Sequence, residues 1–64
     1  MKINGKTIAF SGVQTVAGLL KELGHDPQRV AVEKNGKIIP RASFADEPLA
    51  ENDALEIVQF VGGG

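Results

Sequence analysis

The chain has 64 residues, with seven Lys and Arg against eight Asp and Glu, and it contains no cysteine. A chain of this length forms one small domain, with no room for an enclosed small-molecule pocket. The balanced charge and the lack of Tyr and Trp argue against a nucleic-acid surface. The lack of Cys excludes disulfides, thiolate metal sites and a cysteine nucleophile. The apolar runs are too short to cross a bilayer and the start has no signal-peptide pattern, so we expect a soluble, cytoplasmic protein.

The first half of the chain predicts a β-hairpin followed by one helix. Residues 2–4 and 7–10 flank Asn4-Gly5, a dipeptide suited to the positive φ angles of a tight hairpin turn. Apolar residues then recur at the helical positions i, i+3, i+4 and i+7, namely Val16, Leu19, Leu20 and Leu23. Thr15 is the expected N-cap and Gly24 the expected end of the helix. His25, the only histidine, follows at a helix C-terminus, which predicts a structural role rather than a catalytic one.

The second half predicts three more strands. Residues 30–33 and 37–39 flank a second turn, Asn35-Gly36, and Pro40 ends the returning strand. Residues 41–53 predict an irregular or short helical crossover with Phe44 and Leu49 as its apolar anchors, and residues 54–61 predict the last strand. The expected order is β-β-α-β-β-β. The fold class is therefore α+β, with one helix packed on one face of a mixed four- or five-stranded sheet.

The chain ends in three glycines, Gly62, Gly63 and Gly64. Glycine has no side chain to pack and loses the most backbone freedom on ordering, so we divide the chain into a domain at 1–61 and a flexible tail at 62–64. Such a slender tail suits a narrow channel on another protein, and its reactive group would be the α-carboxylate of Gly64. The alternative is a frayed end or a linker remnant with no role of its own.

Side-chain alternation in the last strand predicts where a partner would dock. Residues 55, 57 and 59 share one face, and residues 56, 58 and 60 share the other. We expect the helix to cover Leu55 and Ile57, which leaves Val58 and Phe60 exposed near the tail as a docking surface. The alternative is that Phe60 only packs over its neighbours in the sheet. No metal-ligand spacing, phosphate-binding loop or nucleophile setting is present, so we expect no catalytic residue and no metal.

Several segments together resemble a known family. They are the strand at 30–33, the run from Asn35-Gly36 through Ile39-Pro40-Arg41, Phe44, and the strand from Leu55 into the terminal glycines. In these segments, and over essentially its whole length, the chain resembles the thiamine-biosynthesis sulfur carriers of the ThiS type. The resemblance implies a β-grasp, ubiquitin-like fold whose first and last strands lie parallel in the middle of the sheet.

The resemblance also implies a mechanism in which other proteins act on this chain. An E1-like activating enzyme would use ATP to adenylate the Gly64 carboxylate. Sulfur from a persulfide donor such as a cysteine desulfurase would then give a thiocarboxylate, which thiazole synthase would consume. The chain itself would be a carrier rather than an enzyme and would bind no cofactor. Two alternatives stay open, a carrier for a molybdopterin, tungstopterin or amino-acid pathway, and a β-grasp interaction module with an inert tail.

Overall fold

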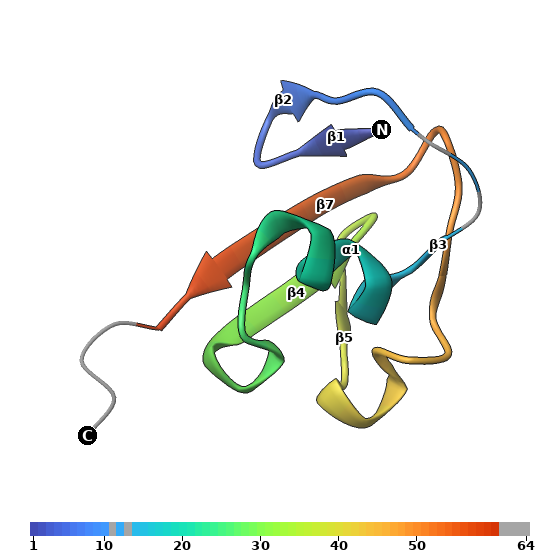
Figure 1. The fold of residues 1–64 in the computed structure, drawn as a ribbon. Helices are drawn as coiled ribbons and strands as arrows, with labels where there is room; N and C mark the ends of the chain where they lie inside the picture. Colours follow the sequence, from blue (N-terminus) through green and yellow to red (C-terminus); the bar gives the residue numbers. More distant parts are fainter. Residues whose placement is uncertain (11, 13, 61–64) are drawn as a thin grey trace.

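The structure is a computed structural model that describes residues 1–10, 12 and 14–60. Figure 1 shows its main sheet and its helix α1, Val16–Leu23. The strands, in chain order, are β1 (Lys2–Ile3), β2 (Lys6–Thr7), β3 (Gln14–Thr15), β4 (Val30–Lys34), β5 (Lys37–Ile39), β6 (Pro48–Leu49) and β7 (Ala54–Gln59). Two 3₁₀ turns, Pro27–Arg29 and Arg41–Ser43, follow α1 and β5 respectively.

The main sheet has five strands in the order β2-β1-β7-β4-β5. Strands β1 and β7 are parallel and central, as the resemblance implies, and the other neighbouring pairs are antiparallel. Strands β3 and β6 form a separate two-stranded pair that the sequence analysis did not predict. Strand β7 pairs with β1 at Ala54 and Leu55 and with β4 from Leu55 to Gln59, so its last residues are paired with β4.

Both predicted hairpin turns are confirmed. Asn4 and Gly5 have φ angles of 52° and 84°, and Asn35 and Gly36 have φ angles of 53° and 85°. Two successive residues with positive φ form the turn type whose twist matches that of the flanking strands, which is why Asn-Gly is favoured there. The second strand of the first hairpin is shorter than predicted, because β2 ends at Thr7.

The ends of α1 follow from local hydrogen bonds, as predicted. The Thr15 side chain accepts a hydrogen bond from the Gly18 N–H at 3.2 Å, which caps the first turn. Gly24 has a φ of 78°, and its N–H and that of His25 donate back to carbonyls of the last turn. This is the pattern of a Schellman motif, and glycine fits it because an L side chain is strained at that φ.

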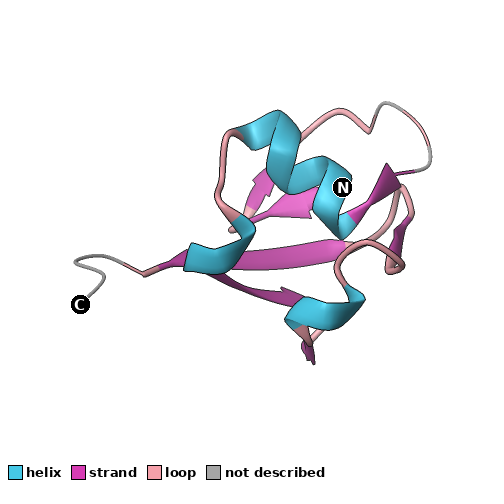
Figure 2. Cartoon of the chain, turned by 60° about the horizontal axis from the view of Figure 1, so that its bottom comes forward, coloured by secondary structure: helices cyan, strands magenta, loops and turns pink. Residues whose placement is uncertain are grey.

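The helix packs on one face of the main sheet, as Figure 2 shows. The buried core between them contains Ile3, Val16, Leu19, Leu20, Val30, Val32, Ile39, Phe44, Leu49, Leu55 and Ile57. The predicted anchors Phe44 and Leu49 are thus confirmed, but the prediction that Leu23 belongs to the covering stripe is wrong. Leu23 is 41% exposed because it is the last residue of the helix, just before the chain turns away at Gly24.

Candidate functional site at the end of strand β7

The two faces of β7 differ as the alternation predicts. Leu55 and Ile57 are buried under the helix, whereas Val58 is 58% exposed and Phe60 is 50% exposed. Gln59, which alternation assigns to the covered face, is exposed at the end of the strand. The strand ends at Gln59, earlier than the predicted 61. The predicted tail, Gly62, Gly63 and Gly64, and the division of the chain after residue 61 lie outside the described residues.

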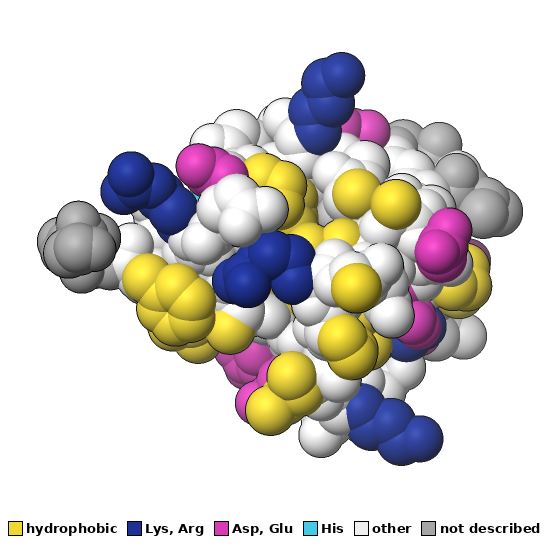
Figure 3. Space-filling model, turned by 90° about the horizontal axis from the view of Figure 1, so that it is seen from below, with side chains coloured by type: hydrophobic (Ala, Val, Ile, Leu, Met, Phe, Trp, Pro, Cys, Tyr) yellow, Lys and Arg dark blue, Asp and Glu magenta, His cyan; other side chains and the backbone are white. Residues whose placement is uncertain are grey.

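Strand register extends the exposed side of β7 into a wider surface. Val58 lies opposite Ala31 of β4, and Glu56 lies opposite Glu33, which in turn lies opposite Ile38 of β5. Ile38 is 74% exposed, more than either Val58 or Phe60. Figure 3, a view from below Figure 1, shows exposed hydrophobic side chains grouped on this side of the molecule with charged side chains between them. The sequence analysis missed Ile38 because its place beside Glu33 depends on the pairing of β4 with β5.

The end of β7 is fixed to the turn that precedes β4. The Phe60 N–H donates to the Arg29 carbonyl at 2.7 Å, one residue beyond the last paired position of the strand. Arg41 holds the same turn, because its Nε donates to the Pro27 carbonyl at 2.8 Å and its Nη2 to the Val30 carbonyl at 3.2 Å. The arginine of the Ile-Pro-Arg segment therefore acts on the fold, at the place where the chain leaves the sheet.

In the middle of β7, hydrogen bonds of the Asn4 side chain take the place of those that a longer β1 would make. Strand β1 ends at Ile3, and the chain turns at Asn4. The Asn4 side chain accepts a hydrogen bond from the Ile57 N–H at 2.7 Å and donates to the Ile57 carbonyl at 3.1 Å. The Asn4 amide thus continues the β1–β7 pairing for one more residue of β7.

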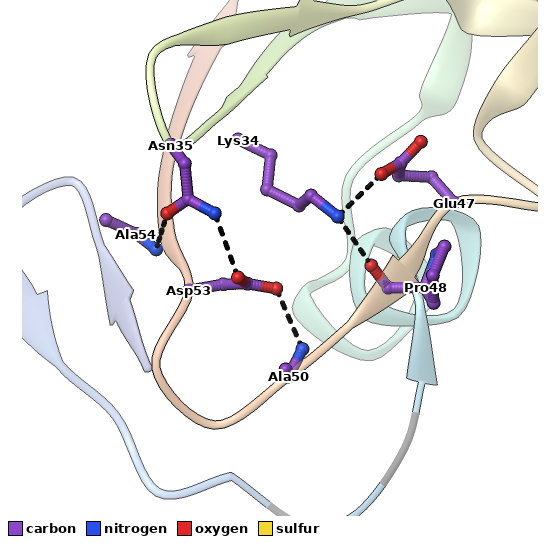
Figure 4. Close-up of polar contacts among 7 residues, drawn as sticks. All are labelled: Lys34, Asn35, Glu47, Pro48, Ala50, Asp53 and Ala54. Atoms are coloured by element: carbon purple, nitrogen blue, oxygen red, sulfur yellow. Dashed lines mark hydrogen bonds and ion pairs between the residues drawn. The ribbon is translucent and has the colours of Figure 1, made fainter.

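The start of β7 carries a polar network, drawn in Figure 4. Asp53 accepts hydrogen bonds from the Asn35 side chain at 2.9 Å and from the Ala50 N–H at 2.8 Å. These bonds, the Asn35 bond above all, lower the pKa of Asp53 because they stabilise the carboxylate. Asn35 also accepts from the Ala54 N–H at 3.0 Å, which ties the second hairpin turn to the first residue of β7.

A second polar contact in Figure 4 joins β4 to the crossover. Lys34 Nζ lies 2.6 Å from Glu47 Oε2 and donates to the Pro48 carbonyl at 3.0 Å. The hydrogen bond to Glu47 raises the pKa of Lys34, since it stabilises the ammonium form. Both contacts lie at the end of β7 away from Phe60, so we assign them to the fold rather than to the site.

Within the described ranges, no three His, Asp or Glu side chains come together in a way that could hold a metal ion. A hollow lies near the start of β7 and is lined in part by Met1, Thr7 and Asp53. In the same part of the chain, no helix is long and apolar enough to cross a bilayer. The feature of the described residues that could serve as a site is the exposed surface formed by Ile38, Val58 and Phe60.

Comparison with known proteins decides the family. The model of the ThiS family matches residues 1–64. The chain belongs to the ThiS family. It is 34% identical to the sulfur carrier protein ThiS of Bacillus subtilis, over 100% of this chain and 98% of that protein. The crystal structure of the ThiS thiamine biosynthesis protein of Geobacter metallireducens superposes with a TM-score of 0.83 at 33% identity, covering 98% of this chain and 96% of that one. This match confirms the β-grasp fold.

Two further relatives are much longer proteins. The chain is 50% identical to a thiazole synthase of Paramagnetospirillum magneticum and 39% identical to one of Magnetococcus marinus, in each case over 62 residues. The chain spans only 19% of the length of each of these proteins. In both of them, a ThiS-like segment thus belongs to the same polypeptide as the protein named thiazole synthase.

Proposed function

We propose that this ThiS-family chain is the sulfur carrier of thiazole formation in thiamine biosynthesis, with the α-carboxylate of Gly64 as the group that carries sulfur. The observation that supports this most is the position of β7. The central strand of the five-stranded sheet precedes the glycine tail in the sequence, and the exposed residues Val58, in this strand, and Phe60, just after it, come shortly before that tail. The two relatives named thiazole synthase favour this pathway over the molybdopterin, tungstopterin and amino-acid alternatives.

The chemistry needs activation from outside. A terminal carboxyl has an ordinary pKa of about 3.3–3.7, so at neutral pH it is an anion and a poor electrophile. In the first step a carboxylate oxygen of Gly64 attacks the α-phosphorus of ATP on an E1-like enzyme, and pyrophosphate leaves. The resulting acyl adenylate has AMP as a leaving group, which a sulfur nucleophile can displace. This chain has no cysteine to compete as an internal nucleophile.

The terminal sulfur of a persulfide, supplied by a donor such as a cysteine desulfurase, then attacks the acyl carbon and AMP leaves. A second thiol cleaves the S–S bond of this acyl disulfide, which gives the Gly64 thiocarboxylate and a new disulfide between the two thiols. Thiazole synthase receives the sulfur from the thiocarboxylate. We place these steps in the cytoplasm, with ATP bound by the activating enzyme and no cofactor bound by this chain.

Docking through the folded body follows from the energetics of the tail. Ordering Gly62, Gly63 and Gly64 in a channel costs about 1–2 kcal/mol for each residue, and the tail has almost no apolar surface to offset this. Roughly 200 Å² of apolar contact elsewhere would supply about 5 kcal/mol at ~25 cal/mol per Å². We propose that Val58 and Phe60 provide part of that contact.

The test is intact-mass analysis of the purified chain after incubation with a ThiS-activating enzyme, ATP and a persulfide donor. We expect a mass increase equal to the replacement of one oxygen by one sulfur, and fragmentation should place it on Gly64. A reaction without ATP is the matched control and should leave the mass unchanged. Sulfur on any other residue would refute the carrier role of Gly64.

A further inference from the structure

The uncovered face of the main sheet carries a charge pattern that the fold does not explain. Register places Glu33 and Glu56 directly opposite each other on the central strands β4 and β7. Like charges in this position repel and weaken strand pairing. Ion pairs in the described part of the chain involve Arg29 with Asp26 and Lys34 with Glu47, so neither of these two glutamates has a cationic partner there.

Apolar side chains flank the glutamate pair toward β5 and toward the end of β7. Ile38 lies opposite Glu33 in the next strand, and Val58 lies two residues along β7 from Glu56 on the same face. Among the exposed large hydrophobic residues of the described chain, Ile38 and Val58 are the two most exposed, at 74% and 58%, and Phe60 follows at 50%. An apolar surface of this kind favours a protein partner, and the two carboxylates beside it restrict what that partner can present.

We propose that this face binds the activating enzyme through a basic side chain that the enzyme places between Glu33 and Glu56, with apolar contacts to Ile38, Val58 and Phe60 around it. Arginine suits the position best, because its guanidinium is weakly hydrated and its planar group of donors can bind carboxylates on both sides. The two carboxylates repel each other in the free chain, and both would attract a cation placed between them. The apolar contacts around the cation would exclude water from the ion pairs.

The position of the pair favours a partner that acts on Gly64. Glu56 lies in β7, the last strand before the tail in the sequence. Phe60 follows Glu56 by four positions, about 13 Å of extended chain. The remaining four residues to Gly64 add at most ~14 Å. One enzyme domain can span both distances, so the enzyme that holds the Gly64 carboxylate for adenylation can also cover Glu33 and Glu56.

This inference rests on the proposed function, and the test separates the two. The double variant Glu33→Gln/Glu56→Gln keeps the shape of both side chains and removes their charge. Because it also removes the repulsion, its urea unfolding midpoint should equal or exceed that of the wild-type chain. In steady-state adenylation with a ThiS-activating enzyme, its KM should rise about tenfold or more, with little change in kcat.

Two further measurements complete the test. The wild-type KM should increase with salt concentration, and that of the double variant should depend on salt much less. Glu51→Gln, which removes an exposed charge from the turn before β7, is the matched control and should keep the wild-type KM. Adenylation of the double variant with a wild-type KM overturns the inference and leaves the proposed function standing. Failure of the activating enzyme to adenylate the wild-type chain overturns both.

Discussion

At the scale of single residues, the asparagines of the two Asn-Gly turns each perform two tasks. Asn4 and Asn35 adopt positive φ angles of 52° and 53°, which few other residues tolerate. Their side chains also bind β7, Asn4 at Ile57 and Asn35 at Ala54 and Asp53. The turn function was predictable from the dipeptide alone. The bonds to β7 were not, because Asn4 and Ile57 are 53 positions apart in the sequence.

Replacing each asparagine by glycine separates these tasks, since glycine keeps the positive φ and loses the side-chain bonds. Asn4→Gly should lower the free energy of unfolding by about 1–3 kcal/mol, because it leaves partly buried Ile57 groups without partners. Asn35→Gly loses bonds that are exposed, where water can replace them, so its cost should be smaller. Urea unfolding of both variants measures the difference. If Asn35→Gly lowers the free energy of unfolding as much as Asn4→Gly or more, the Asn4 side-chain bonds are not the more stabilising ones.

Asp53 predicts a pH dependence of stability. Its pKa in the fold lies below the ordinary value of 3.8, so the folded state binds a proton less readily than the unfolded chain does. Its contribution is therefore fully present above the ordinary pKa and is lost as the pH falls through the folded pKa. At neutral pH the wild-type chain should be more stable than Asp53→Asn, and the gap should narrow in acid. Urea unfolding of both chains at several pH values measures this difference in stability. A difference that does not change with pH would contradict a stabilising role for the Asp53 carboxylate.

At the scale of elements, the two faces of β7 should respond differently to substitution. Ile57→Ala removes a buried side chain under α1 and should cost about 2–5 kcal/mol of unfolding free energy. Val58→Arg and Phe60→Arg change exposed positions, so stability should change little while adenylation weakens substantially. Chemical unfolding and adenylation kinetics on the same samples make the comparison. If Phe60→Arg unfolds the domain or leaves adenylation unchanged, the assignment of Phe60 to the docking surface is wrong.

The turn before β4 gives a second prediction at this scale. Arg41 holds the Pro27 and Val30 carbonyls, and the neighbouring Arg29 carbonyl accepts the hydrogen bond from Phe60. Arg41→Ala should lower the free energy of local opening of this turn by about 1 kcal/mol. The amide hydrogen of Phe60 should then exchange about fivefold faster. The Ile57 amide, bound to Asn4 instead, is the internal control. Equal changes at both amides would indicate global destabilisation rather than a local effect on the root of the tail.

At the scale of the whole molecule, the sequence predicted the features that repeat or that depend on neighbouring residues. The helix, both hairpin turns, the covered residues Leu55 and Ile57, and the exposed Val58 all follow from local periodicity and turn chemistry. The β3–β6 pair was missed because strands of two residues contain no period to detect. Glu33 opposite Glu56 was missed because only the register of β4 on β7 brings them together. The candidate site was thus predictable along β7 but not across the sheet.

The last prediction concerns the distance between the folded domain and Gly64. The hydrogen bond from Phe60 to Arg29 fixes the point where the chain leaves the sheet, so an enzyme that docks on the sheet face meets a tail of defined length. Deleting Gly64 or adding an alanine after it changes the reach by up to about 3.3–3.6 Å, whereas a misplacement of about 1 Å can already cost 10²-fold in rate. Adenylation of both variants should fall by about 10²-fold or more.

Their urea unfolding curves should match that of the wild-type chain, because the changes leave every residue of the buried core in place. Gly63→Ala keeps the length and adds one methyl group, so it tests the width of the enzyme's channel separately from its depth. We expect its adenylation rate to fall as well. If all three variants are adenylated at the wild-type rate, adenylation does not depend on the distance between the sheet and the terminal carboxylate. Docking at Val58 and Phe60 would then be no constraint on how the Gly64 carboxylate reaches ATP.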